Sequence, residues 1–396
     1  MPKQNVPALR LDGFSGEWEE KTIQQISVPV SRVNPDSTAP IMMISAADGF
    51  INQSEKYSSD NAGKSLSKYV ELHQGELAYN HGASKLRPFG SCFELRETAA
   101  RVPFVYHCFR VVEEHPTFTS YSLNRKSVQS QLERLVSSGA RMDGLLNISF
   151  PQYGTVTTHF PTFEEQQAIG AIFTNLDAAI NQHTLKHKAL QQSKTALMQR
   201  MFPQEGQTVP ELRLEGFSGE WETVSLNELQ KRCLVILGRG EVISQIDINA
   251  RPGSYPIYSS SAKNRGLFGR YGRYMFSDER ITWSIDGGGQ FFYRPTHRYS
   301  VTNVCGWMKV NTDTIDTNFL YLALYLQWLD QSFDYTMKAH PSKIVQIYNP
   351  CFPPTLEEQQ AIGAVFTNLD QLIAAEAQYI ASLKQAKTAL LQRMFI

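Results

Sequence analysis

Two stretches of this chain are nearly identical: EEQQAIGAIFTNLD at 164–177 and EEQQAIGAVFTNLD at 357–370. The likeness extends to the endings KTALMQRMF at 194–202 and KTALLQRMF at 387–395, so that 24 of the 39 aligned positions match. Repetition of this kind indicates a fold in which one structural element is used twice.

A shorter repeat precedes each half of the chain. Residues 6–19 are VPALRLDGFSGEWE and residues 209–222 are VPELRLEGFSGEWE, with 12 of 14 positions identical. The segments that follow, at about 20–160 and 223–352, show no comparable match to each other. We infer that the matched parts do the same job twice, while the variable parts do two different jobs of one kind. Recent recombination within the gene is the alternative explanation.

The long repeats are predicted to be helices. Thr162 and Thr355 stand where N-caps are expected, and glutamates follow in the first turn, where carboxylates favour the helix dipole. Steps then alternate between four and three residues, as in a coiled coil. The two seams are Leu176, Ile180, His183, His187, Leu190, Lys194, Leu197, Met201 and Leu369, Ile373, Glu376, Ile380, Leu383, Lys387, Leu390, Met394. Because the seams also contain charged residues, neither helix is apolar enough to stand alone, and pairing the two helices would bury both seams. We expect antiparallel pairing, because each helix follows its own domain and the intervening chain must return. Two long helices inside one globule are the alternative.

The variable segments have the mixed pattern of an α+β fold. Short β-rich runs bounded by turn residues predict strands, and they lie at Pro40–Ser45, Glu76–Asn80, Val102–Phe109, Tyr255–Ser259, Arg273–Phe276, Arg280–Ile285, Gln290–Tyr293 and Val304–Val310. Helices are expected at 127–141 and Thr317–Phe333. The predicted architecture is therefore two mixed α/β domains separated by a pair of long antiparallel coiled-coil helices, with a pseudo-twofold internal repeat.

The second variable segment carries an uneven charge distribution. Between Arg251 and Arg298 there are eight Arg or Lys against Asp278, Glu279 and Asp286, a local charge of +8 − 3 = +5, although the whole chain is neutral with 38 basic and 38 acidic residues. Arginine and lysine bind phosphates and also pair with guanine. The candidate DNA contacts in this segment are Lys263, Arg265, Arg270, Arg273 and Arg294. A solvated basic face above core aromatics is the alternative.

The first variable segment offers one comparable loop, at 79–88, with the sequence YNHGASKLRP. It follows a predicted strand and combines amide, imidazole, hydroxyl and cationic groups, which together suit contacts with bases and phosphates. The candidate DNA-binding residues are Asn80, His81, Ser84, Lys85 and Arg87. An ordinary surface turn is the alternative.

Several classes of protein are disfavoured. There is no G-x-x-x-x-G-K-[ST] loop for ATP, no G-x-S-x-G or H-E-x-x-H motif, and no C-x-x-C pair among the five cysteines. Residues 349–352, Asn-Pro-Cys-Phe, resemble an adenine methyltransferase loop, but no cofactor-binding glycine motif precedes them. We expect no catalytic, metal or cofactor site. With neither an apolar run of membrane-spanning length nor a signal-peptide core at the start, a cytoplasmic protein with no membrane partner is expected.

Together, the two long repeats, the boxes LDGFSGEWE and LEGFSGEWE, and YPIYSSSAKNRGLFGRYGRY followed by ITWSIDGGG resemble the DNA-specificity subunit of type I restriction–modification systems. The resemblance implies target-recognition domains at 1–160 and 204–352, a central conserved helix at 161–203 and a C-terminal conserved helix at 353–396. Each domain would recognise one half of a bipartite site in double-stranded DNA, with the helices setting the gap.

The resemblance also implies partners. Modification subunits would carry S-adenosylmethionine and methylate adenine at N6. Restriction subunits would add ATP- and Mg-dependent translocation and cleavage, so the complete assembly would be a site-specific endodeoxyribonuclease and DNA methyltransferase, while this chain is a non-catalytic scaffold. A coiled-coil adaptor that does not bind DNA and a fused adenine methyltransferase are the alternatives.

Overall fold

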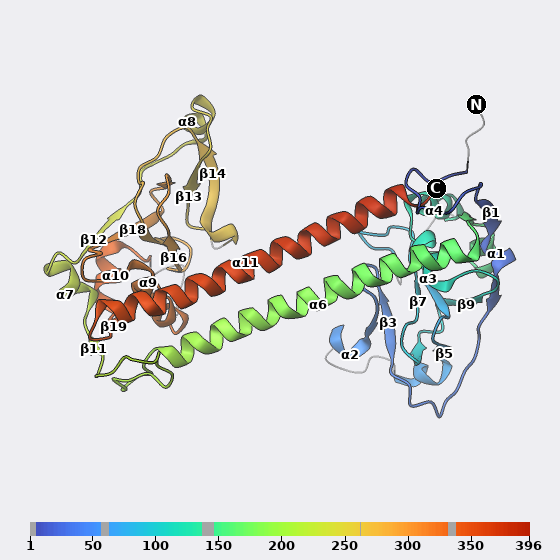
Figure 1. Ribbon diagram of the computed structural model, residues 1–396, viewed down its shortest axis with the longest axis horizontal. Helices are drawn as coiled ribbons and strands as arrows, with labels where there is room; N and C mark the ends of the chain where they lie inside the picture. The colour runs from blue at the N-terminus through green and yellow to red at the C-terminus, as the bar shows by residue number, and fades with distance from the viewer. Residues whose placement is uncertain (1–4, 57–62, 137–145, 262, 332–337) are drawn as a thin grey trace. The chain divides into compact units, whose positions relative to one another are not determined.

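The computed structural model of the protein divides into two compact units, and each is described by itself. Unit 1 contains residues 1–183 and 379–396, and unit 2 contains residues 184–378. The structure describes residues 5–56, 63–136, 146–261, 263–331 and 338–396. Both units combine helices with sheets whose strand pairs are antiparallel, apart from the parallel pair β13–β17 of unit 2, so the fold is α+β, as predicted (Figure 1).

Unit 1 contains a four-stranded antiparallel sheet with the order β2–β9–β6–β7 and three strand pairs, β1–β10, β3–β4 and β5–β8. Its strands are β1 (Glu19–Thr22), β2 (Ser27–Pro29), β3 (Met42–Ser45), β4 (Gly49–Asn52), β5 (Val70–His73), β6 (Leu77–Asn80), β7 (Ser91–Glu94), β8 (Ala99–Val102), β9 (His107–Val111) and β10 (Thr157–Phe160). Its short helices are α1 (Ile23–Ile26), α2 (Gln53–Lys56), the 3-10 helix η1 (Gly63–Lys68), α3 (Pro116–Leu123), α4 (Lys126–Leu135) and α5 (Phe150–Gly154).

Unit 2 contains a four-stranded sheet with the order β12–β18–β15–β16, a three-stranded sheet β14–β13–β17 and the pair β11–β19. Its strands are β11 (Glu222–Thr223), β12 (Val235–Arg239), β13 (Tyr255–Tyr258), β14 (Leu267–Tyr271), β15 (Arg280–Ser284), β16 (Phe291–Arg294), β17 (Ser300–Val301), β18 (Cys305–Val310) and β19 (Cys351–Phe352). Its short helices are α7 (Leu226–Lys231), α8 (Gln245–Ala250), the 3-10 helix η2 (Lys263–Gly266), α9 (Thr317–Leu329) and α10 (Pro341–Ile347).

The two variable segments share a topology that their sequences do not reveal. In each four-stranded sheet the first strand pairs with the last, and the last pairs with a strand from the middle of the segment. Helix α1 packs against α5 in unit 1, as α7 packs against α10 in unit 2. The variable segments are therefore two versions of one kind of domain.

Most predicted strands occur, with two corrections. The expected strand Val102–Phe109 is split into β8 and β9 by a turn in which the Tyr106 amide donates to the Pro103 carbonyl at 3.0 Å. Proline cannot donate to a strand ladder, which explains the break. The expected strand Arg273–Phe276 is absent, and only Phe276 forms an isolated bridge, with Tyr299. The strand there is β14, which ends at Tyr271.

Two expected helices are present but shorter. Helix α4 ends at Leu135, and residues 137–141 of the predicted helix lie outside the described residues. Helix α9 ends at Leu329, and residues 332 and 333 likewise lie outside them.

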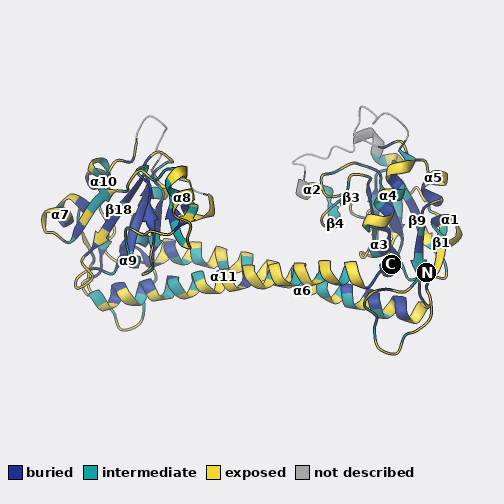
Figure 2. Ribbon diagram, turned by 90° about the horizontal axis from the view of Figure 1, so that it is seen from above, coloured by how far each residue is buried: buried dark blue, intermediate teal, exposed yellow. Residues whose placement is uncertain are grey.

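The two repeats form the long helices α6 (Phe163–Met201) and α11 (Leu356–Arg393). Their predicted N-caps are confirmed, because the hydroxyls of Thr162 and Thr355 accept from the amides three residues on, at 3.4 and 3.2 Å. The residues of both predicted seams are all buried or half-buried, whereas many of the residues between them are exposed (Figure 2).

Ion pairs join the two helices within each unit. In unit 1, Lys387 pairs with Asp177, and in unit 2, Lys194 pairs with Asp370. Lys186 in unit 2 also pairs with Glu376. In unit 1 the His183 ring also contacts the Tyr379 ring, so in each unit residue numbers on one helix fall as those on the other rise, which is the order of antiparallel neighbours.

Each box is attached to a helix start by a buried ion pair. Arg10 binds both carboxylate oxygens of Glu165 at 2.9 and 2.7 Å, and Arg213 binds those of Glu358 at 2.8 and 2.7 Å. The glutamate side chains are 0% and 1% exposed. Bidentate geometry and exclusion of water make such pairs costly to break from one side.

The residue after each glutamate reaches into the variable segment. The side-chain oxygens of Gln166 and Gln359 accept from the backbone amides of His115 and Asp316, at 2.9 and 3.0 Å. Four residues later, the helix glycines lie close against these same residues. We call each set a clasp. Clasp 1 is Arg10, Glu165, Gln166 and Gly170 with His115, and clasp 2 is Arg213, Glu358, Gln359 and Gly363 with Asp316.

An aromatic cluster completes each attachment. Trp18 packs edge-on against Phe118 and Phe395 in unit 1, and Trp221 contacts Phe202 and Phe319 in unit 2. The backbone of each box also bonds to a helix end, at Arg393 in unit 1 and Arg200 in unit 2. Each box therefore joins the start of one long helix to the end of the other.

Candidate nucleic-acid interface

The basic region of unit 2 is built on the hairpin of β13 and β14. Its turn, residues 263–266, places Asn264 and Arg265 in the left-handed region, each with φ 50°. Lys263 and Arg265 are exposed there, and the Arg265 guanidinium reaches the Tyr293 carbonyl at 3.4 Å. Two cations are thus presented to solvent at one end of the hairpin.

Arg294 lies beneath this turn instead of on the surface. Its side chain stacks on the Tyr258 ring at 3.6 Å, and it donates to the Arg265 carbonyl at 2.8 Å and the Thr282 hydroxyl at 2.9 Å. The residue is only 3% exposed, and burial lowers the pKa of its guanidinium to about 10. Arg294 therefore holds the turn in shape and is not presented to a ligand.

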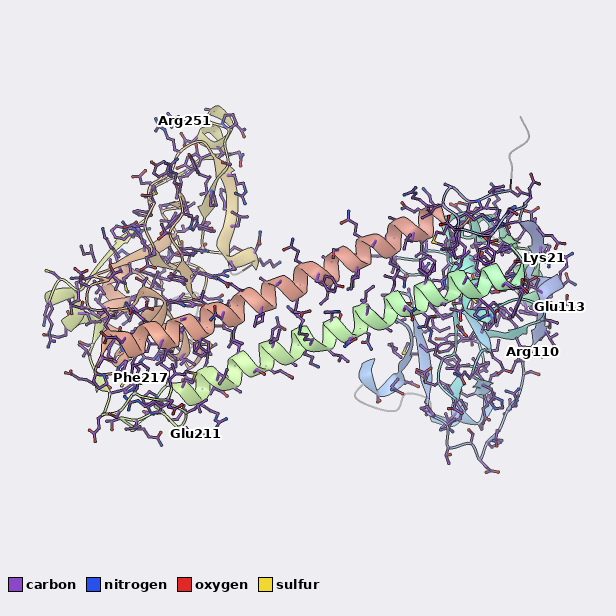
Figure 3. All side chains as sticks on the ribbon, in the orientation of Figure 1. Lys21, Arg110, Glu113, Glu211, Phe217 and Arg251 are labelled. Atoms are coloured by element: carbon purple, nitrogen blue, oxygen red, sulfur yellow. The ribbon has the colours of Figure 1, made fainter. Side chains whose placement is uncertain are left out.

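Two further candidates lie at the other end of β14. Arg270 is exposed and donates to the Ser254 carbonyl at 2.8 Å. Arg273 is exposed and lines a cleft of about 590 Å³ together with Arg239, Arg251 and Trp307. Figure 3 shows Arg251 at the α8 end of unit 2. Exposed guanidinium groups beside a cleft suit contacts with an anionic polymer.

The candidate loop of unit 1 is mostly occupied with its own structure. The Asn80 side chain accepts from the Gly82 amide at 2.9 Å, and the Ser84 hydroxyl accepts from the Arg87 amide at 3.0 Å. His81 is 7% exposed, with Nδ1 2.8 Å from the Leu146 carbonyl oxygen. These contacts fix the loop, which leaves its exposed groups in defined positions.

Arg87 braces this loop, whereas Lys85 points outward. The Arg87 guanidinium donates to the carbonyls of Ala46 and Asn124, at 3.1 and 2.6 Å, and burial lowers its pKa. Lys85 and the neighbouring Leu86 are exposed. Of the five candidates in the loop, Lys85 alone is exposed.

Sequence reasoning missed part of the unit 2 surface. Arg239, at the end of β12, and Arg251, which follows α8, both line the cleft but were not selected. The exposed amides Gln245 and Asn249 on α8 were also missed. Arg251 stood in the basic stretch, so its charge was a usable signal, whereas α8 offers no charge pattern of its own.

Other kinds of site find little support in the described residues. Within them, no group of three or more His, Cys, Asp or Glu is placed to hold a metal ion. No helix there combines the length and apolar character needed to cross a membrane. Residues 351–352 of the methyltransferase-like stretch form β19, which pairs with β11, and Phe352 is buried against Phe319. That stretch is therefore part of the framework of unit 2.

Comparisons with known proteins agree with this geometry. The family of the type I restriction modification DNA specificity domain matches residues 218–385. The chain is 44% identical, over 91 residues, to a Mycoplasma pneumoniae protein provisionally named the N-terminus of a type I specificity subunit, covering 22% of this chain and 48% of that one. A second protein of the same organism, also provisionally named a type I specificity subunit, is 31% identical over 156 residues. The match covers 38% of this chain and 49% of that protein. The matched region thus spans about half the length of these relatives.

The fold is also similar to a solved structure. The S subunit of a type I restriction–modification system from M. genitalium superposes with a TM-score of 0.67 at 15% sequence identity, over 99% of both chains. At this identity the likeness concerns the fold. Taken with the family match and the relatives, it shows that the chain is similar to the specificity subunits of type I restriction–modification systems.

Proposed function

We propose that this protein is the DNA-specificity subunit of a type I restriction–modification enzyme and recognises a bipartite site in double-stranded DNA. The observation that carries the proposal is the pair of equivalent clasps, each of which holds a domain of the same topology but unmatched sequence. Such a design suits a protein that reads two different sequences through one mode of attachment.

The proposed domains are target-recognition domains at 1–160 and 204–352, with conserved helices at 161–203 and 353–396. We further propose that α6 and α11 form an antiparallel coiled coil and that the chain has pseudo-twofold symmetry. The equivalent ion pairs Asp177–Lys387 and Lys194–Asp370 and the partly buried seams support this. A helix of 39 residues extends about 58 Å at about 1.5 Å per residue, enough to set the gap between two half-sites.

The exposed cations are the proposed contacts with DNA: Lys85 in unit 1, and Lys263, Arg265, Arg270 and Arg273 in unit 2. Asn80, His81, Ser84, Arg87 and Arg294 are proposed to shape the loops that carry them, because each has at least one side-chain polar atom bonded within the fold. Arg270 and Arg273 would bind phosphates or guanine. If their substitution weakens binding equally on all DNA sequences, the contact is to phosphate, and if the loss is confined to one base position, the contact is to a base.

The proposed partners are modification subunits, which carry S-adenosylmethionine, and restriction subunits, which use ATP and Mg. The chain itself is proposed to be non-catalytic. It is also proposed to lie in the cytoplasm, where the DNA that it would bind is found. A fused methyltransferase is not favoured, because Asn349 is engaged through its backbone with Gln327 and Phe352 is buried. An adaptor that does not bind DNA is not favoured either, since the family is defined by a DNA specificity domain.

Exchange of the first variable segment tests the proposal. Residues 20–160 are replaced by the matching segment of another family member, and the methylated adenines are mapped in cells that also contain the modification subunit. We expect one half of the recognised site to change and the other half to stay. A change in both halves, or in neither, would contradict the modular function.

The same cells test the role of the helices. Insertion of one helical turn after Asp177 should alter the gap between the half-sites and leave both half-sequences intact. A gap that stays fixed would show that the helices do not set the distance. A wild-type protein that supports no site-specific methylation and binds no duplex would defeat the proposed function itself.

A further inference from the structure

Helix α8 has an unusual surface for a short helix at the edge of a domain. Its four outward residues, 245, 246, 249 and 250, are all exposed, and none of its six residues is buried. Ile246 is 79% exposed, and Val242 just before the helix is 76% exposed. Figure 2 shows α8 in the exposed and intermediate colours at the edge of unit 2. Ile246 and Val242 are the two most exposed large apolar side chains of the described residues, which makes this part of unit 2 a candidate binding surface.

The helix is nevertheless firmly attached. Ser244 caps it through a reciprocal pair of bonds with Asp247, and the Gly272 amide donates to the Arg251 carbonyl at 2.7 Å. Gly253 lies so close to β14 that a Cβ atom there would be 2.5 Å from the Gly272 Cα. The outward face is therefore presented in a fixed position, as recognition requires.

The amides on this face are arranged as a pair. Gln245 donates to the Asn249 side-chain oxygen at 3.0 Å, one turn along the helix. Whichever way the two amides are oriented, one acceptor and one amide donor then remain on the exposed side. Adenine presents the complementary groups, the N6 amino donor and the N7 acceptor, in the major groove.

The positive charge around α8 favours a nucleic acid as the ligand of this surface. The cleft beside α8 is lined by Arg239, Arg251 and Arg273 against Glu241 and Asp247, a balance of 3 − 2 = +1, and the Asp247 carboxylate is already bonded to Ser244. Exposed Arg270 and Arg298 add further positive charge to the same unit. An α-helix with its side chains is about 10–12 Å across, which a major groove about 12 Å wide admits.

We propose that α8 is the base-reading element of unit 2: the Gln245–Asn249 pair recognises an adenine, and Ile246 contacts the methyl group of a thymine. Arg251 and Arg273 bind the phosphates on either side of the groove. This inference rests on the proposed function, and it adds the prediction that the half-site read by unit 2 contains an A·T pair.

The test uses the full chain with its modification subunit and a randomised duplex library, from which bound sequences are selected and sequenced. The variant is Gln245→Ala with Asn249→Ala, which keeps a good helix former at both positions. Its matched control is Asn227→Ala with Gln230→Ala, which removes two exposed amides from α7, another six-residue helix of unit 2.

We expect the α8 variant to lose its preference for adenine at one position by about 5- to 150-fold, the range for a bidentate base contact, with the rest of the site unchanged. The α7 control should select the wild-type site. An α8 variant that retains the full site, or that weakens equally on every sequence, would overturn the proposal.

A second arm tests Ile246 by removing the thymine methyl group from the DNA. Deoxyuridine replaces thymidine at the A·T position, and binding should fall about fourfold for the wild-type chain, the value of one buried methyl group. The Ile246→Ala variant should bind both duplexes equally. A deoxyuridine effect of the same size in both proteins would contradict the contact.

The outcomes also separate the two proposals. If the wild-type chain selects a bipartite site and the α8 variant selects the same one, the proposed function stands and the role of α8 is wrong. If the wild-type chain selects no site at all, the proposed function fails and the inference fails with it.

Discussion

The substitution Arg213→Ala should destabilise unit 2 by far more than loss of an ordinary surface ion pair. Arg213 holds Glu358 through two bonds of 2.8 and 2.7 Å, and it also donates to the carbonyls of Ser218 and Gly219. Truncation leaves a carboxylate that is 1% exposed without its partner. Breaking a buried pair from one side costs about 3–5 kcal/mol, and because Arg213 itself is 13% exposed we expect about 3 kcal/mol.

Urea unfolding followed by tryptophan fluorescence measures the effect. Four of the five tryptophans lie in unit 2, namely Trp221, Trp283, Trp307 and Trp328, so the signal reports mainly on this unit. Unit 2 has 378 − 184 + 1 = 195 residues, and for that size about 3 kcal/mol corresponds to a fall in melting temperature of about 6–12 °C.

The matched control is Arg232→Ala. Arg232 also pairs with a glutamate, Glu228, at 2.9 Å, but both side chains are substantially exposed, so its loss should cost about 0.5 kcal/mol or less. Adding Glu358→Gln to Arg213→Ala should recover part of the stability, because the buried charge is then removed. If Arg213→Ala unfolds at the same urea concentration as Arg232→Ala, the clasp does not stabilise the unit and the reasoning from burial is wrong.

Three further substitutions probe other contacts. Gly363→Ala places a Cβ 2.7 Å from the Asp316 carboxylate and should cost about 1–3 kcal/mol in urea unfolding, although alanine normally stabilises a helix; a gain in stability would refute the close approach. Burial lowers the pKa of His107 below its ordinary 6.5, so its contribution to stability is present above about pH 6.5 and is lost as the pH falls through the lower folded value. His107→Gln should therefore flatten the pH dependence of unfolding of unit 1 below pH 6.5, and an unchanged slope would exclude this histidine as a cause. Arg294→Lys keeps the charge but loses the stack on Tyr258 and the forked hydrogen bonds, so it should cost about 1–3 kcal/mol; unfolding at the wild-type urea concentration would contradict that role.

Features that depend on neighbours in the sequence were predictable. The N-caps of α6 and α11, the spacing of their seams and strands such as β6 and β15 follow from local patterns. The clasps were not predictable, because they join residues 155 and 145 positions apart. The matched boxes were recognised as repeats, but nothing in their sequence says that the arginine of each box binds the second glutamate of each helix.

The candidate site was harder to predict because sequence gives the charge of a residue but not its direction. Arg294 ends a strand, β16, whose residues are almost all buried, so strand alternation does not bring its side chain to the surface. Arg87 is turned inward by two backbone carbonyls from distant segments. Conversely, Ile246 would ordinarily be assigned to a core, and only the structure shows that its side chain is 79% exposed.

The clasps also explain how matched and unmatched parts coexist in one chain. The side-chain oxygens of Gln166 and Gln359 accept hydrogen bonds from backbone amides of the variable segments. The residues that supply these amides differ, since they are His115 in unit 1 and Asp316 in unit 2. A backbone donor is present whatever side chain the position carries, except proline. The two halves of the chain therefore need the same residue at the box arginine and at the glutamate, glutamine and glycine of the helix. The variable segment must supply only a backbone amide at the right place. Attachment of this kind leaves the exposed loops and α8 free to differ, which is what the proposed recognition of two different DNA sequences requires.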